Sequence, residues 1–114
     1  MREYDLPKFY TISQPFERPV ESDIPGAVLR EMTVLFPDTE TLRGKSVAVT
    51  AGSRGIANID TVTKSVVDFL NDHGADPFII PAMGSHGGGT SAGQTALLEH
   101  YGISEETMGV PVKA

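Results

Sequence analysis

The sequence predicts an α/β fold with a parallel βαβ, Rossmann-like core. Two short apolar runs, Val47–Val49 and Phe78–Ile80, have the length and composition of buried strands. The segment between them, Asn58–His73, carries apolar residues at helical spacing and is long enough to cross from one strand to the next. Strands joined by one right-handed crossover lie parallel, and the turns that follow them meet at the same edge of the sheet.

Residues 1–44 are predicted to form an N-terminal edge strand and a lead-in to this core. Lys8–Gln14 contains the β-branched and aromatic residues of a strand, and the prolines on either side of it confine such a strand to an edge position. Ile24–Met32 is predicted to form a short helix, with Asp23 as its N-cap and Pro25 in its first turn.

The core, residues 45–114, contains two predicted helices. The apolar stripe of Asn58–His73 consists of Ile59, Val62, Val66, Phe69 and Leu70. Asn58 or Asp60 is expected to cap this helix, and Gly74 to end it. A second helix is predicted from Ser91 to Tyr101, with Gln94 at capping-box spacing from Ser91. Its inward side chains are expected to be Ala92, Leu97, Leu98 and Tyr101.

The run Val110–Val112 resembles the start of a third strand. A parallel sheet must be covered on both faces, and one or two helices do not cover both. We therefore expect the chain to be an incomplete portion of a larger two-domain protein, with the missing C-terminal portion as its partner. The alternative is a complete small domain that buries its open faces in a homo-oligomer.

Composition and charge exclude several function classes. The 114 residues include 15 acidic and 9 basic side chains, for a formal net charge of −6, whereas a nucleic-acid surface needs clustered basic residues. The sequence has no cysteine, so it offers neither a disulfide nor a thiolate metal site. No apolar run approaches the length of a membrane span. We expect a cytoplasmic protein with no nucleic-acid or membrane partner.

Arg54 and His86 are the side chains best suited to chemistry. Each follows a predicted strand, so both are expected to open into one crevice at the sheet edge, where open α/β sheets bind ligands. A histidine there can act as an acid, a base or a metal ligand, and an arginine fork matches a carboxylate or phosphate. The alternatives are a histidine that bonds a turn carbonyl and a surface arginine that pairs with an acidic residue.

Glycines surround His86 and strengthen the interpretation as a binding site. Glycine permits positive φ and lets a ligand approach the main chain, and the helix that follows adds N–H groups that attract anions. The residues predicted to bind an anion or cofactor here are Gly84, Ser85, Gly87, Gly88, Gly89 and Thr90. No residue is predicted to bind a metal.

The first turn is also similar to the cofactor turn of short-chain dehydrogenases. Two glycines that the pyrophosphate requires are replaced here by Ala51 and Ala57, and no Tyr-x-x-x-Lys pair follows. A dinucleotide site therefore remains only a third hypothesis.

The turns Gly52–Ile56 and Met83–Gly88, taken together, resemble those of the N-terminal domain of the nickel-dependent lactate racemase (LarA) family. The resemblance covers roughly residues 45–113. It matches Arg54 and Ser53 with substrate-binding positions, and His86 with one of the family's two catalytic histidines.

The resemblance implies racemisation or epimerisation of a 2-hydroxy acid, with hydride removed from C2 and returned. It also implies a nickel pincer nucleotide, whose lysine tether and nickel ligand have no counterpart in this sequence, so the isolated chain is expected to be inactive. The sequence departs from the best-known racemases at Ala51, Gly55 and Gly87, which leaves lactate open as the substrate. The alternative is a non-catalytic α/β module that binds carboxylate or phosphate.

Overall fold

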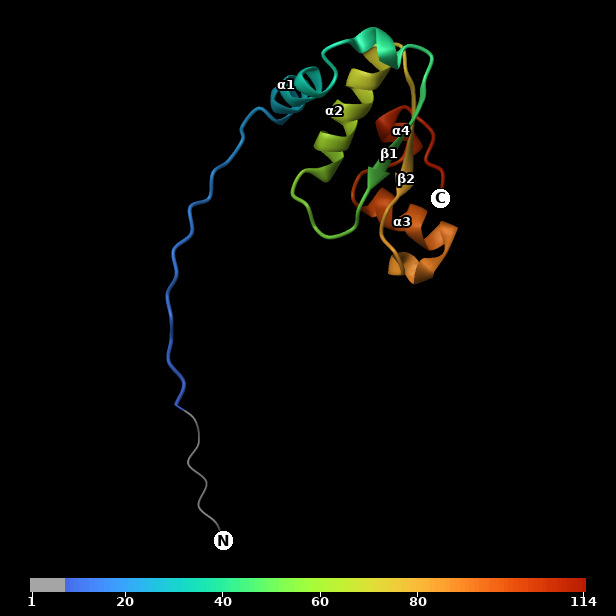
Figure 1. Ribbon diagram of the computed structural model, residues 1–114. Helices are drawn as coiled ribbons and strands as arrows, with labels where there is room; N and C mark the ends of the chain where they lie inside the picture. Colours follow the sequence, from blue (N-terminus) through green and yellow to red (C-terminus); the bar gives the residue numbers. More distant parts are fainter. Residues whose placement is uncertain (1–7) are drawn as a thin grey trace.

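The computed structural model describes residues 8–114 and has a mixed α/β architecture around a two-stranded parallel sheet (Figure 1). Strand β1 is Ser46–Ala51 and strand β2 is Asp76–Pro81. They pair in register from Ser46 opposite Asp76 to Ala51 opposite Pro81. The predicted parallel arrangement of the two strands is confirmed.

Helices and 3₁₀ turns make up about half of the rest of the described chain. In order along the chain they are α1 (Ile24–Leu35), the 3₁₀ turn η1 (Thr39–Leu42), α2 (Ile59–Asp72), the 3₁₀ turn η2 (His86–Gly89), α3 (Ser91–His100) and α4 (Glu105–Met108). Helix α2 is the crossover between the strands, as the sequence predicts. Within residues 8–114, none of these helices has the length and apolar character needed to traverse a bilayer.

Helix α2 covers one face of the sheet. Val67 of α2 and Ile79 of β2 are fully buried and belong to one apolar cluster with Ala51 and Leu98. The alternate residues of β1, Val49 and Ala51, point to this face because successive side chains of a strand alternate. Burying these aliphatic side chains stabilises the contact between α2 and the sheet, at about 1.5–3 kcal/mol for each full side chain.

The opposite face of the sheet is covered far less by the described residues. Ala48 and Thr50 of β1 are exposed on it. On β2, Phe78 is half-buried beneath Lys113, whose Nζ lies 4.1 Å from the ring centroid. The expectation that a further portion of a larger protein, or a second copy, covers this face stays a prediction.

The third strand predicted at Val110–Val112 is present as a single parallel bridge from Val112 to Ile79. The Ile79 amide donates to the Pro111 carbonyl at 2.8 Å, and the Lys113 amide donates to the Ile79 carbonyl at 2.8 Å. Strand β2 is therefore paired on both sides, whereas β1 is an edge strand among the described residues.

The edge strand predicted at Lys8–Gln14 is wrong. Residues 8–22 form no strand or helix and run away from the folded body (Figure 1). Phe9, Tyr10 and Ile12 are 94%, 81% and 90% exposed, so they pack against nothing in the described chain. Strand propensity alone does not form a strand, because the hydrogen bonds of a strand require a partner edge.

The helix predicted at Ile24–Met32 is confirmed and extends to Leu35, before Pro37. Asp23 caps α1 as predicted, since its carboxylate accepts from the Gly26 amide at 3.0 Å. For α2, Asn58 occupies the N-cap position but makes no side-chain cap bond and has a φ of 55°.

Three details predicted for α3 are wrong. Thr90 is its N-cap rather than Ser91, and its hydroxyl accepts from the Gly93 amide at 3.1 Å. The Gln94 side chain donates to the Gly84 carbonyl instead of closing a capping box. Ala92 is exposed rather than inward, because the buried side of α3 is centred on Leu98.

Candidate functional site

The two turns that follow β1 and β2 lie side by side at the carboxyl edge of the sheet. The ladder continues one step beyond the strands, since the Ala82 amide donates to the Ala51 carbonyl at 2.8 Å. The chain then departs into residues 52–58 on one side and residues 82–90 on the other. Parallel pairing thus delivers both turns to a common rim.

An open crevice of about 520 Å³ lies between these turns. Its lining residues are Gly52, Ser53, Arg54, Ile56, Ala82, Met83, Gly84, Ser85 and His86. The structure therefore brings Ser53, Arg54 and His86 to one crevice, together with Gly84 and Ser85 of the predicted glycine-rich site.

Ser53 and His86 are in direct contact across the crevice. The Ser53 Oγ lies 2.5 Å from the His86 Nδ1, which joins residues 33 positions apart. The His86 amide also donates to the Met83 carbonyl at 3.2 Å, which fixes the backbone of the turn. The imidazole is therefore oriented by a side-chain contact from the neighbouring turn, and it is also exposed to solvent.

Arg54 has no hydrogen bond or ion pair with any residue from 8 to 114. The ion pairs of that part of the chain are Arg30 with Glu21, Arg43 with Glu40, and Lys64 with Asp68. In the described chain the guanidinium of Arg54 is thus not committed to an acidic partner, and its planar fork can take a carboxylate or phosphate with two hydrogen bonds.

The remaining glycine-rich residues lie outside the crevice lining. Gly87, Gly88 and Gly89 all have positive φ, between 62° and 72°. A Cβ on Gly87 would lie 2.5 Å from the backbone carbon of Gly93, so this glycine permits η2 to pack against the start of α3. Thr90 is occupied by capping α3. An anion-binding role for Gly87–Thr90 stays a prediction.

Gln94 of α3 and Tyr101, the C-cap residue of this helix, hold the turns in place, and the sequence analysis missed this role. The Gln94 Nε2 donates to the Gly84 carbonyl at 2.8 Å and to the His86 carbonyl at 3.4 Å. The Tyr101 hydroxyl donates to the Ser53 carbonyl at 3.1 Å. Gln94 and the C-cap residue Tyr101 are seven residues apart, about two helical turns, so both lie on the same side of α3. That spacing was visible in the sequence, but the turn carbonyls that accept these bonds were not.

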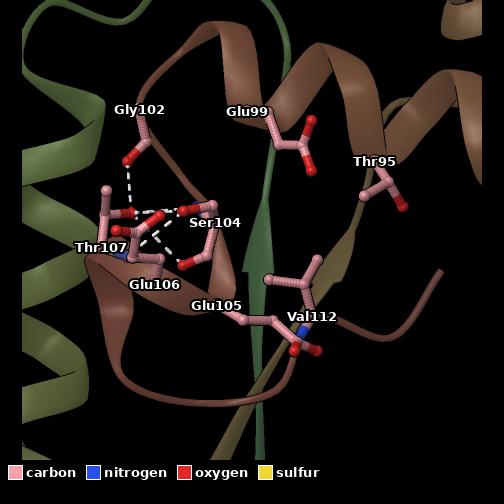
Figure 2. Close-up of a pocket in the computed structure, with 8 residues that line it drawn as sticks. All are labelled: Thr95, Glu99, Gly102, Ser104, Glu105, Glu106, Thr107 and Val112. Carbon is pink, nitrogen blue, oxygen red and sulfur yellow. Dashed lines mark hydrogen bonds between the residues drawn. The ribbon is translucent and has the colours of Figure 1, made fainter.

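A second pocket, of about 500 Å³, lies between α3, α4 and Val112 (Figure 2). Its side chains include three carboxylates, Glu99, Glu105 and Glu106. The Glu105 carboxylate accepts from the Val112 amide at 3.1 Å, so it stabilises the start of the third strand. Across residues 8–114, no group of three or more His, Cys, Asp or Glu side chains could hold a metal ion.

The other two histidines lie outside the crevice. His73 caps α2, and its Nδ1 is 2.7 Å from the Phe69 carbonyl. His100 is the last residue of α3 and packs edge-on to the Tyr101 ring, with the centroids 5.8 Å apart. His86 is therefore the histidine that the fold places with Arg54.

Comparisons with family models, with curated proteins and with solved structures found no match to this chain.

Proposed function

We propose that the crevice between the two turns binds the carboxylate of a small organic acid. One observation supports this most strongly. Arg54, without an acidic partner among residues 8–114, lines the same crevice as the oriented imidazole of His86. The guanidinium would hold the carboxylate bidentately, and a hydroxyl on the adjacent carbon would then come within reach of the imidazole. Positioning of this kind is a large part of catalysis.

The reaction we propose is racemisation or epimerisation of a 2-hydroxy acid. His86 would take the proton of the substrate hydroxyl and would return it afterwards. The hydride from C2 would need a separate redox cofactor as its acceptor and donor, because none of the crevice side chains can take a hydride. Imidazole suits this task because a histidine exchanges a proton near neutral pH. The likeness of the two turns to those of lactate racemases supports this finer proposal, which includes a second base on the opposite face of the substrate.

The nickel nucleotide implied by that resemblance belongs to the proposal, but the crevice residues do not fit the task of holding a metal. The crevice offers one imidazole, two serine hydroxyls and one guanidinium, which are not a nickel ligand set, because imidazole is the one usual nickel ligand among them and a guanidinium has no acceptor atom. We therefore assign no step of the reaction to it. A Rossmann-like continuation of the sheet in a larger two-domain protein, and a cytoplasmic location, are further parts of the proposal.

A non-catalytic module that binds carboxylate or phosphate is the second candidate. The exposure of His86 favours it, because general acid–base chemistry gains from the exclusion of water. In that case Arg54 would bind the anion, and His86 would only add a hydrogen bond.

Exchange of His86 distinguishes the two candidates. In the full-length protein, His86→Gln is expected to lower turnover of a 2-hydroxy acid roughly 10²–10⁴-fold, the usual contribution of a general base. Chiral chromatography of lactate and longer 2-hydroxy acids measures this turnover. His100→Gln is the matched control, because His100 is exposed and outside the crevice. Turnover that survives His86→Gln would eliminate the base role, and saturable carboxylate binding without any turnover would identify the module.

A further inference from the structure

The contact between Ser53 and His86 decides which nitrogen of the imidazole can meet a ligand. Neutral imidazole has one N–H donor and one acceptor nitrogen. The Ser53 Oγ lies at hydrogen-bond distance from the His86 Nδ1, at 2.5 Å. The other nitrogen, Nε2, makes no hydrogen bond to any residue in the described range 8–114. Nε2 is thus the nitrogen available to a molecule in the crevice.

The partners of this contact are themselves held by α3. The Tyr101 hydroxyl donates to the carbonyl of Ser53, and the Gln94 amide donates to the carbonyl of His86. Helix α3 and its C-cap residue therefore fix the backbone on both sides of the Ser53–His86 hydrogen bond. Tyr101 is half-buried and Leu98 beside it is fully buried, so this end of α3 is anchored in the core.

We infer that Ser53 fixes the tautomer of His86, and that Tyr101 is a positioning residue that acts through Ser53. In this arrangement the His86 Nδ1–H donates to the Ser53 Oγ, and Nε2 carries the lone pair that faces a ligand. This inference rests on the proposed function, because the tautomer matters only if His86 acts as a base, and a base at this position needs an unprotonated Nε2.

The direction of the hydrogen bond follows from what a base must do. If the Ser53 hydroxyl donated to Nδ1, the proton of the neutral ring would sit on Nε2, and that nitrogen could not accept another. If Ser53 accepts, Nε2 can take a proton while Nδ1–H keeps the same partner. The hydroxyl proton of Ser53 is then available for the bound carboxylate, which keeps Ser53 in contact with the substrate as well.

Nitrogen NMR tests the inference directly on this chain. Two-bond ¹H–¹⁵N spectra recorded at alkaline pH, about two units above the ordinary histidine pKa, identify which ring nitrogen carries the proton. We expect mainly Nδ1–H for His86 in the wild type. Ser53→Ala is expected to move it to mainly Nε2–H, the tautomer that free histidine favours, and Ser53→Thr to restore Nδ1–H. Tyr101→Phe is expected to give a mixture.

The same spectra contain an internal control. The His73 Nδ1 faces the Phe69 carbonyl at 2.7 Å, and a carbonyl only accepts, so His73 is expected to remain Nδ1–H in every variant. Wild-type His86 observed as Nε2–H would overturn the inference whether or not any variant folds. An unchanged tautomer in folded Ser53→Ala would also overturn it, and an unchanged tautomer in Tyr101→Phe would remove the role of Tyr101.

Failure of this inference is separable from failure of the proposed function. Titration of the same samples with lactate and with longer 2-hydroxy acids reports carboxylate binding, whereas the tautomer is read without ligand. Tyr101→Phe is expected to weaken lactate binding roughly two- to tenfold, as the loss of one positioning hydrogen bond would. Binding of lactate or a longer 2-hydroxy acid with the wrong tautomer would overturn only the inference. The expected tautomer without binding of any of these acids would contradict only the proposed function.

Discussion

The two edges of the sheet carry the same residue types, but their polar side chains are paired within the chain at one edge and available to a ligand at the other. At the amino edge, Arg43 pairs with Glu40 at 3.0 Å, and the Gly44 amide donates to the Gly74 carbonyl at 2.7 Å. His73 at this edge bonds the carbonyl of its own helix. At the carboxyl edge, Arg54 has no acidic partner among the described residues, and His86 keeps one ring nitrogen for the crevice.

This difference shows how a ligand-binding site can be told apart from a place where the same residue types only stabilise the fold. Residue type does not separate them, since each edge has an arginine, a histidine and glycines of positive φ. What separates them is whether the chain itself satisfies the polar groups. At the amino edge the hydrogen-bond partners of these groups come from the same or the adjoining element. At the carboxyl edge Arg54 and His86 line the open crevice with polar atoms that no described residue pairs.

The largest effect we predict comes from exchanging one glycine at each edge. Gly87 and Gly44 have φ of 62° and 69°, so alanine is strained at both, at about 1–2 kcal/mol. A Cβ on Gly87 would also meet the Gly93 backbone at 2.5 Å, whereas one on Gly44 meets nothing within 4 Å. Overpacking adds about 1–3 kcal/mol, so Gly87→Ala is expected to lose about 2–5 kcal/mol in urea unfolding.

Gly44→Ala is the control, and it should lose only the strain of its backbone. Equal losses at the two positions would show that η2 does not pack tightly on α3, and would weaken the role assigned to that helix in holding the second turn.

The next largest effect that we predict is on ligand affinity, and it distinguishes Arg54 from Arg43. Arg54→Gln is expected to weaken binding of lactate or phosphate roughly tenfold to a hundredfold, because a hydrogen bond to a charged group contributes about 1.5–3 kcal/mol. Arg43→Gln should leave that affinity unchanged, since Arg43 is engaged with Glu40 at the other edge. Isothermal titration of each variant measures the dissociation constant. Equal weakening by both variants would indicate a general loss of positive charge rather than a site.

Much of the carboxyl edge could be predicted from the sequence because its determinants are local and topological. The stripe of α2 and the two flanking apolar runs predict a parallel crossover, and handedness then brings Arg54 and His86 to one rim. The observed strands and α2 match these expectations to within two residues at each end.

The rest depended on partners that sequence patterns do not specify. Lys8–Gln14 has strand propensity, but it runs away from the folded body and does not pair with the edge of β1 that the other described residues leave free. The capping-box spacing of Gln94 was real, yet the Gly84 carbonyl is its hydrogen-bond acceptor. Likewise, the Ser53–His86 contact requires that side chains from two turns meet at hydrogen-bond distance. The predicted strand pairing places both turns at one edge of the sheet, but it does not specify which side chains touch there.

The smallest effect that we predict is a pH-dependent change in the free energy of unfolding, and it comes from the amino edge. The hydrogen bond from Arg43 is the main cause that lowers the pKa of Glu40 below its usual 4.5, and attraction between the charges adds to it. A carboxyl whose pKa is lowered by folding adds stability above its unfolded pKa, and this stability disappears as the pH falls through the folded value.

Arg43→Gln should therefore lower the free energy of unfolding slightly at pH 7 and leave it unchanged at strongly acidic pH, well below 4.5. Both side chains are largely exposed, so water and salt screen the pair, and added salt should shrink the difference at pH 7. Urea unfolding of wild type and variant at the two pH values measures it. A difference that persisted in acid would mean that Arg43 stabilises the amino edge by packing its aliphatic stem near Gly74 rather than by its charge.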